Sequence, residues 1–198
     1  MKLNKDFYLC DGLTLSCNLL GKVLCRKTEN GILKARIVET EAYMGQGDKA
    51  AHASKGKTDR TAVLFEDGGK AYIYLIYGMY CCLNISANIE NIPDCVLIRA
   101  LEPLDGMDEM RKNRKTDKIY NLCSGPGKLC QALQLTKDDN ATDLTGDCIW
   151  IEEDGFAVGE IATSKRINID YSQEAIDFLW RFYIPDNPYL SVKERKKK

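Results

Sequence analysis

The stretch Leu33-Lys-Ala-Arg-Ile-Val-Glu-Thr-Glu-Ala-Tyr43 decides the fold, because its residues alternate over a length that suits a long β-strand. Successive side chains of a strand point to opposite faces. We therefore expect one face to carry Ala35, Ile37, Glu39, Glu41 and Tyr43, and the other to carry Val38, Thr40 and Ala42. The first face would place two carboxylates beside an aromatic ring.

Further strands and helices are indicated on both sides of this strand. Strand patterns occupy residues 23–26, 71–76, 79–85, 95–101 and 147–152. Helical patterns occupy residues 13–20, which Asp11 can cap, and residues 104–114 and 172–180. Ser124 can cap one more helix, with Pro126 in its first turn and Lys128 nearby, and such a helix start can bind a phosphate.

The length and composition favour one domain inside the cell. A chain of 198 residues suits a single domain, and its longest apolar stretch, residues 71–83, is too short to span a membrane. Asp6 and Asp11 interrupt any apolar core of an export signal. We expect a domain over residues 1–192 and a solvated, disordered basic tail over residues 193–198.

The charge does not favour a nucleic-acid partner. The net charge is −1, and the tail holds five of the 28 basic residues and one of the 29 acidic residues, which leaves −5 on the rest of the chain. A surface that binds DNA must then be a local patch. Nine cysteines without a C-x-x-C pair indicate reduced, mostly buried thiols and no zinc site.

Four tyrosines gather in the two strands at residues 71–85, where the Tyr77-Gly78 step suits a hairpin turn. Tyr77 would stand at the exposed tip, where a large ring is unfavourable unless it meets a partner. A base stack is one such partner, since minor-groove proteins insert side chains between bases. Before this hairpin, residues 45–69 form a long polar loop that carries His52, the single histidine.

Three polar residues on the predicted sheet need partners. Glu41, beside Tyr43, can accept a proton from water, although a salt-bridged structural glutamate is the alternative. Arg99 shares a strand face with Cys95 and Leu97. It needs an anion, and Glu41 is the candidate, with a water between the two groups. Asn84 needs its amide satisfied among apolar neighbours.

Four motifs turn these signals into a resemblance: Arg36-Ile-Val-Glu-Thr-Glu-Ala-Tyr43, Ala50-Ala-His52, Tyr74-Leu-Ile-Tyr-Gly-Met-Tyr80 and Val96-Leu-Ile-Arg-Ala-Leu-Glu-Pro103. They resemble the alkyladenine (3-methyladenine) DNA glycosylase family. Leu19-Leu-Gly-Lys22, Cys123-Ser-Gly-Pro-Gly-Lys-Leu-Cys130 and Arg181-Phe-Tyr183 also fit, in the family's order. The resemblance covers residues 7–192.

The resemblance implies an α+β fold, with a curved, mostly antiparallel sheet, flanking helices and a protruding hairpin that inserts into DNA. It implies Glu41 as general base and Arg99 as the residue that helps hold the attacking water. Tyr77 corresponds to the intercalating residue. Tyr43, His52 and Tyr74 correspond to the walls of the base pocket, and Asn84 to the asparagine that disfavours the amine of guanine.

The implied activity is excision of alkylated or deaminated purines from double-stranded DNA by base flipping and hydrolysis of the glycosidic bond. The candidate substrates are 3-methyladenine, 7-methylguanine, hypoxanthine and ethenoadenine. Tyrosine walls would attract the positive charge of alkylated purines. His52 is a candidate acid or hydrogen-bond partner for the leaving base. With no lysine at a matched position, we expect an intact strand with an abasic site and no lyase activity.

We also expect a monomer that needs no cofactor and acts in the cytoplasm with the nucleoid of a bacterium, or in a nucleus. Arg60, Lys128 and the tail are candidate phosphate contacts, whereas Asp59, where the family would suggest proline, and Glu66-Asp67 add negative charge near the DNA. Two rival classes stay open. One is a non-catalytic binder of damaged DNA, and the other is a metal-dependent nuclease that uses Glu39, Glu41, Asp48 and His52.

Overall fold

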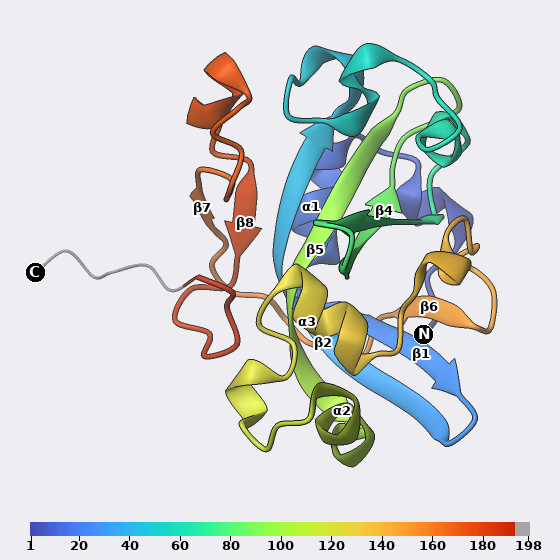
Figure 1. Ribbon diagram of the computed structural model, residues 1–198, viewed down its shortest axis with the longest axis vertical. Helices are drawn as coiled ribbons and strands as arrows, with labels where there is room; N and C mark the ends of the chain where they lie inside the picture. The colour runs from blue at the N-terminus through green and yellow to red at the C-terminus, as the bar shows by residue number, and fades with distance from the viewer. Residues whose placement is uncertain (193–198) are drawn as a thin grey trace, which may run out of the picture.

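The fold is a curled antiparallel sheet built around two long strands, β2 (Gly31–Met44) and β5 (Asp94–Asp105), in a computed structural model that describes residues 1–192. The sheet order is β3-β4-β5-β2-β1-β6, and β8 pairs with both β2 and β7. The other strands are β1 (Val23–Thr28), β3 (Ala71–Ile76), β4 (Tyr80–Ser86), β6 (Ile149–Glu152), β7 (Ala162–Ser164) and β8 (Arg181–Tyr183). In Figure 1, β2 and β5 run side by side along the length of the molecule. The expected α+β class with a curved antiparallel sheet is confirmed.

One prediction for β2 is wrong, because the strand does not alternate without interruption. Ile37 pairs with Leu101 of β5, Glu39 with Ala100 and Thr40 with Ile98, so Val38 and Arg99 are extra residues in two adjoining bulges. A bulge shifts the alternation by one residue. Ala35 and Ile37 therefore join Ala42 in the main core, while Val38 packs with Tyr183. The bulges lie where β2 exchanges its partner β1 for β8.

The helices flank the sheet. α1 (Gly12–Leu19) packs on β2 and β5, and the Asp11 carboxylate caps it as expected, accepting from the Leu13 and Thr14 backbone N–H groups at 3.0 Å. α2 (Met107–Arg114) and α3 (Pro126–Ala132) lie together near the opposite end of the long strands (Figure 1). Short 3₁₀ helices occupy Lys5–Tyr8, Gly45–Gly47, His52–Lys55, Ala62–Phe65, Ile119–Asn121, Lys137–Asp139 and Gln173–Asp177.

Three helix predictions need correction. Residues 104 and 105 extend β5, because the chain turns into α2 only at Gly106, which has a positive φ of 75°. Ser124 does not cap α3, since Gly125 occupies the capping position without a side-chain bond. Within residues 172–180, Gln173–Asp177 form a 3₁₀ helix in place of the expected α-helix. The Ala42 N–H donates to the Trp180 carbonyl, and this bond holds the end of the segment beside β2.

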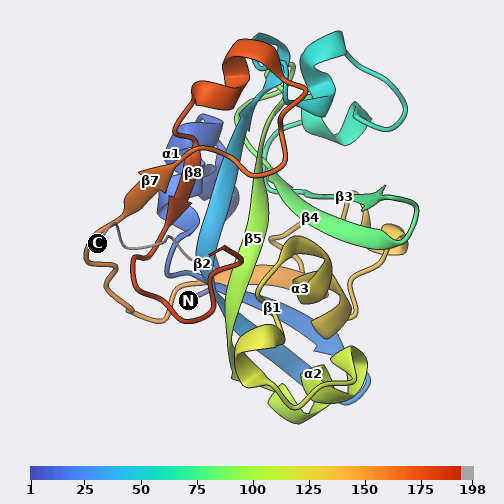
Figure 2. The ribbon, with the colours of Figure 1, turned by 60° about the vertical axis from the view of Figure 1, so that its left-hand side comes forward.

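The β3–β4 hairpin and the loop before it agree with the sequence. Tyr77 and Gly78 both have positive φ, 52° and 68°, and the Met79 N–H donates to the Ile76 carbonyl at 3.1 Å. Residues 77–79 connect Ile76 to Tyr80, with which it pairs. In Figure 2, this hairpin extends to the right of β5, away from the two long strands. Residues 45–69 contain three of the 3₁₀ helices and no strand.

Two further observations concern the state of the cysteines and the length of the helices. All nine cysteines are free thiols, as expected, and five of them are buried. None of the helices within residues 1–192 is long and apolar enough to cross a membrane. The basic tail predicted at residues 193–198 lies outside the described residues.

Candidate active site

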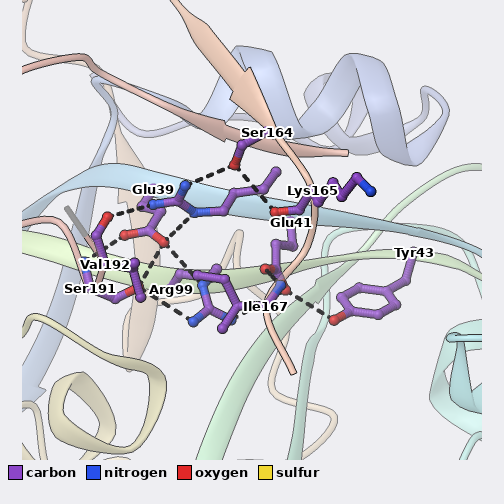
Figure 3. Close-up of polar contacts among 10 residues, drawn as sticks. Glu39, Glu41, Tyr43, Arg99, Ser164, Lys165, Ile167, Ser191 and Val192 are labelled. Atoms are coloured by element: carbon purple, nitrogen blue, oxygen red, sulfur yellow. Dashed lines mark hydrogen bonds and ion pairs between the residues drawn. The ribbon is translucent and has the colours of Figure 1, made fainter. Parts of the chain in front are cut away.

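Glu41 is a fully buried carboxylate on β2, held by three donors (Figure 3). Its Oε1 accepts from the Ile167 backbone N–H at 2.7 Å. Its Oε2 accepts from the Tyr43 hydroxyl at 3.0 Å and lies 3.2 Å from Nη1 of Arg99. Burial raises the pKa of Glu41, because these partners only partly offset the loss of hydration. The carboxylate is thus brought closer to the pKa of a useful general base.

Glu39 lies two residues earlier and is bound much more tightly. Its Oε1 accepts from Nε of Arg99 at 3.0 Å and from Nε of Arg181 at 2.8 Å. Ser191 adds its backbone N–H to Oε2 at 2.6 Å and its hydroxyl to Oε1 at 2.7 Å. Burial raises the pKa of Glu39, but the two guanidinium groups outweigh it, and the pKa lies below its usual value. Glu39 is therefore a fixed anion behind Arg99.

Arg99 joins the two glutamates. Its Nε faces Glu39 and its Nη1 faces Glu41, as Figure 3 shows. The expected partner of Arg99 is thus present, but the expected water between Arg99 and Glu41 is wrong for this structure, because the groups are in direct contact at 3.2 Å. The bulge that makes Arg99 an extra residue in β5 lies beside Glu39, where the guanidinium can reach both carboxylates.

A second buried ion pair anchors the segment that carries Ile167. Arg166 and Asp48 have fully buried side chains, and Nη2 of Arg166 lies 2.8 Å from Oδ1 of Asp48. The guanidinium carbon lies 4.7 Å from the Tyr43 ring centre and 5.0 Å from that of Trp180. Because Arg166 directly precedes Ile167, this anchor fixes the backbone N–H that Glu41 accepts.

An aromatic pocket adjoins Glu41. Tyr43, His52, Tyr74, Asn84 and Tyr171 line a cavity of about 40 Å³, together with Ala50, Tyr72 and Cys95. It lies next to a larger cleft of about 490 Å³, which is also lined by Tyr43, Tyr74 and Tyr171. The small volume means that side chains must shift before a purine can enter. An apolar cleft with a few convergent polar groups is the usual form of a ligand site.

His52 and Asn84 are held by the backbone and side chain of Tyr72. Nδ1 of His52 lies 2.9 Å from the Tyr72 hydroxyl, and the ring centres of His52 and Tyr74 are 4.4 Å apart. The Asn84 amide donates to the Tyr72 carbonyl at 3.1 Å. Loss of hydration and the nearby Arg60 lower the pKa of His52 to about 4, so the ring is neutral at pH 7. A neutral ring favours a role for His52 as a hydrogen-bond partner of the base, and not as the acid that protonates it.

The wall of the large cleft includes the hairpin turn and the start of α3. Tyr77 and Lys128 both line it, and the Tyr77 side chain is 78% exposed at the tip. Nζ of Lys128 contacts the Asn121 side chain and lies 3.5 Å from the Ser124 hydroxyl. The cleft therefore connects the buried carboxylate to an exposed aromatic tip.

Comparison with known proteins agrees with this geometry. The sequence profile of the family described as "Methylpurine-DNA glycosylase" matches residues 6–188. A relative from Alkaliphilus oremlandii (strain OhILAs) is 50% identical over 202 residues, covering 98% of this chain and 100% of the relative. A second, from Clostridioides difficile (strain 630), is 48% identical over 201 residues, covering 92% and 100%. Both are named "Putative 3-methyladenine DNA glycosylase".

The chain belongs to the methylpurine-DNA glycosylase family. Membership makes it a DNA glycosylase, a hydrolase of base-excision repair whose substrate is DNA. The resemblance drawn from the sequence motifs is confirmed at the level of the family.

The glycosylase cleft brings together most of the residues singled out from the sequence. Tyr43, Tyr74, Tyr77, Arg99 and Lys128 line the large cleft, and His52 and Asn84 line the adjoining pocket. Glu41 lies behind Tyr43 and Arg99, bonded to both. Arg60 lies over the Tyr74 ring, 5.0 Å from its centre, and its side chain is exposed, so its contact with a DNA phosphate stays a prediction.

Several site residues gave no clear signal in the sequence. Arg166, Ile167 and Tyr171 come from an irregular segment after β7, and Ser191 comes from the end of the described chain. Arg181 opens the Arg181-Phe-Tyr183 motif, which was the one available hint that β8 contributes to the site. The tyrosine-rich hairpin could have indicated Tyr72 as the support for His52.

The carboxylates proposed for a nuclease metal site have other partners. Asp48 is paired with Arg166, and Glu39 with Arg99 and Arg181. Within residues 1–192, no three His, Cys, Asp or Glu side chains gather as metal ligands would. The arrangement is that of an ion-pair network beside an aromatic pocket.

Proposed function

We propose that this glycosylase excises alkylated and deaminated purines with a water molecule activated by Glu41. The observation that carries the proposal is the buried Glu41 carboxylate, which three donors hold at the edge of an aromatic cleft large enough for a nucleotide. A carboxylate with a raised pKa, fixed beside a bound base, is suited to accept a proton from water. The alternative function is a damaged-DNA binder without catalysis.

The chemistry follows from the groups that face Glu41. Because Arg99 contacts Glu41 directly, the water must enter between the carboxylate and the sugar of the flipped nucleotide. The water oxygen forms a bond to C1′, the C1′–N bond breaks and its electron pair leaves with the base, and Glu41 takes the proton. Arg99 holds the carboxylate in place and keeps part of its negative charge balanced, and Ile167 fixes its orientation.

Base recognition is assigned to the aromatic pocket. Tyr43, His52 and Tyr74 supply rings on which a flipped purine can stack. Asn84 is buried and lines the pocket, and we propose that it excludes normal guanine by disfavouring the exocyclic amine of that base. The proposed substrates are 3-methyladenine, 7-methylguanine, hypoxanthine and ethenoadenine.

Tyr77 is the proposed wedge that fills the space left by the flipped nucleotide. The ring is exposed at the tip of the hairpin that borders the cleft, and its neighbour Met79 is 70% exposed. Two large exposed side chains on a tight turn suit insertion into a minor groove. Lys128 is the proposed phosphate contact beside the same cleft.

The reaction is proposed to leave the strand intact, without a lyase step. Lys128 is the lysine that lines the cleft, and its amine is engaged by Asn121 and Ser124 rather than directed at Glu41. A Schiff base needs a free amine at C1′. We further propose that the enzyme acts as a monomer, without a cofactor, on the double-stranded DNA of the nucleoid in the cytoplasm of a bacterial cell.

The direct test is the release of free base from four matched duplexes, each with one of the proposed lesions, in excess EDTA. The proposal predicts base release, an abasic strand that breaks only on later treatment with alkali, and no product trapped by borohydride. Specific binding to the lesions without release would favour the damaged-DNA binder. Activity that EDTA abolishes would favour a metal-dependent enzyme, and a trapped adduct lost in Lys128→Ala would establish a lyase step.

A further inference from the structure

Arg60 is placed against the aromatic pocket by the loop between β2 and β3. Its guanidinium carbon lies 5.0 Å from the centre of the Tyr74 ring, and Nη2 lies 3.4 Å from Nε2 of His52. Burial raises the pKa of the Tyr72 phenol, and the nearby Arg60 partly offsets that rise. The cation thus contacts two residues that line the proposed base site and influences a third.

The charge of Arg60 is not balanced by a neighbouring anion. Among the ion pairs of residues 1–192, Arg166 is paired with Asp48, and Arg99 and Arg181 are paired with Glu39, but none includes Arg60. Charges that form buried pairs largely cancel at a distance. Arg60 therefore brings to the side of the pocket a positive charge that no ion pair among residues 1–192 neutralises.

His52 does not compensate for this cation. Its ring is neutral at pH 7, because its pKa is lowered to about 4. A neutral imidazole can accept one hydrogen bond and donate one, but it brings no negative charge to the pocket. Of the groups that line the pocket, the tyrosines also remain neutral, because burial raises the pKa of both Tyr43 and Tyr74.

Two of the tyrosine rings at the pocket each lie against an arginine guanidinium. Arg60 lies over Tyr74, and Arg166 lies over Tyr43 at 4.7 Å. The attraction of a ring for a cation comes from its quadrupole. A positively charged base stacked on Tyr74 would gain this attraction but would also meet the repulsion of Arg60. The ring therefore favours a cationic base less than an unoccupied tyrosine would.

We propose that Arg60 is a specificity-determining residue that biases this pocket toward neutral purine lesions, such as hypoxanthine and ethenoadenine, over cationic N-alkylated purines such as 7-methylguanine. The proposal rests on the proposed function, because it concerns the base that enters the same pocket. It assigns Arg60 a role at the base in place of a contact with a DNA phosphate.

The experiment compares single-turnover excision of 7-methylguanine, hypoxanthine and ethenoadenine from duplexes of one sequence. Arg60→Met removes the charge and keeps an unbranched side chain, and Arg60→Lys is the matched control that keeps the charge. Because Arg60 is exposed, both variants should fold. The affinities of the same duplexes for Glu41→Gln and for Glu41→Gln with Arg60→Met separate base binding from protonation of the leaving base.

The expected result for Arg60→Met is a rise of about three- to tenfold in both the excision rate and the affinity for 7-methylguanine relative to the neutral lesions, from the repulsion between two charges roughly 6 Å apart that is screened by the water around the exposed Arg60. Arg60→Lys should leave the ratios within about twofold, since it keeps the charge. An equal loss for all three lesions in Arg60→Met, with a weaker salt dependence, would establish a phosphate contact and overturn the proposal. A wild type that releases no base would overturn the proposed function, and the affinity ratios would still test Arg60.

Discussion

Glu39 and Glu41 lie two residues apart on β2, both are fully buried and both contact Arg99, yet their pKa values are shifted in opposite directions. Glu39 has two guanidinium partners and two donors from Ser191. Glu41 shares one guanidinium and has two neutral donors, the Ile167 N–H and the Tyr43 hydroxyl.

The difference shows what separates a structural carboxylate from a general base in one ion-pair network. Burial penalises both charges, and the number of cations around each carboxylate decides the direction in which its pKa shifts. Glu39 is stabilised as an anion and holds Arg99 in place. Glu41 keeps a higher proton affinity, and it also borders the aromatic cleft through Tyr43.

Glu39→Gln should cause the largest loss of stability. The change leaves Arg99 and Arg181 without their shared anion inside the protein, which costs about 3–5 kcal/mol of unfolding free energy. Urea denaturation measures it. The control is Glu174→Gln, which removes an exposed surface pair with Lys49 and should change the stability far less. Equal, small losses in both variants would show that Glu39 is not the anchor of Arg99.

The pH dependence of excision should follow Glu41. Only the ionised carboxylate can accept the proton, so the single-turnover rate should fall about tenfold per pH unit below the pKa of Glu41. Because that pKa is raised, the rate should begin to fall at a pH above the usual pKa range of a glutamate. A rate that stays level until the pH reaches the ordinary range would contradict the assignment.

The two glutamates should also affect stability against pH with opposite signs. The lowered pKa of Glu39 contributes stability that is present above its unfolded pKa and lost as the pH falls through its folded pKa. The raised pKa of Glu41 acts the other way, since its ionised form is disfavoured in the folded state and this penalty disappears on acidification. At neutral pH, Glu39→Gln should therefore be less stable than the wild type and Glu41→Gln more stable, and both differences should shrink as the pH falls.

Ser191→Ala should have a smaller effect of the same kind as Glu39→Gln. The hydroxyl bond to Glu39 is lost while the backbone N–H bond stays, so we expect a loss of about 1–2 kcal/mol. Excision should fall with it, because Arg99 also donates to this hydroxyl at 3.3 Å. Thermal unfolding and single-turnover rates measure the two effects, and Ser191→Thr, which keeps the hydroxyl, should restore both.

Tyr77→Gly should have the smallest effect on the fold. Tyr77 has a positive φ of 52°, which glycine adopts without strain, so the unfolding free energy should change by less than about 1 kcal/mol. Binding to lesion-containing duplex should weaken, because the exposed ring would no longer fill the gap. Unchanged affinity and unchanged excision would remove Tyr77 from the proposed mechanism.

Local patterns in the sequence were sufficient for much of this fold. The Tyr77-Gly78 turn and the Asp11 cap depend on residues close together in the chain, and both are confirmed. The bulges in β2 and β5 were missed, because they arise where β2 changes partners and no residue in the strand marks that point. The helix at residues 172–180 was wrong because a contact with β2 outweighed its local helical pattern.

The candidate site likewise contains residues that the sequence indicated and residues that it did not. Glu41 and Tyr43 could be paired from strand periodicity, since the bulges lie before them. Ser191 and Ile167 could not be assigned, because they reach the glutamates from more than a hundred residues away in the chain. Both donate a backbone N–H group, which every residue except proline carries, so residue type gives no signal for these bonds, and Ser191 adds its hydroxyl.

Single-turnover excision of hypoxanthine by Glu41→Gln, with the affinity for the same duplex measured in parallel, tests most directly whether Glu41 is the general base. If it is, excision should fall by at least about a hundredfold while the lesion is still bound and the protein is at least as stable as the wild type at neutral pH. Excision by Glu41→Gln at the wild-type rate would contradict the central claim, because the proton of the attacking water would then pass to another group.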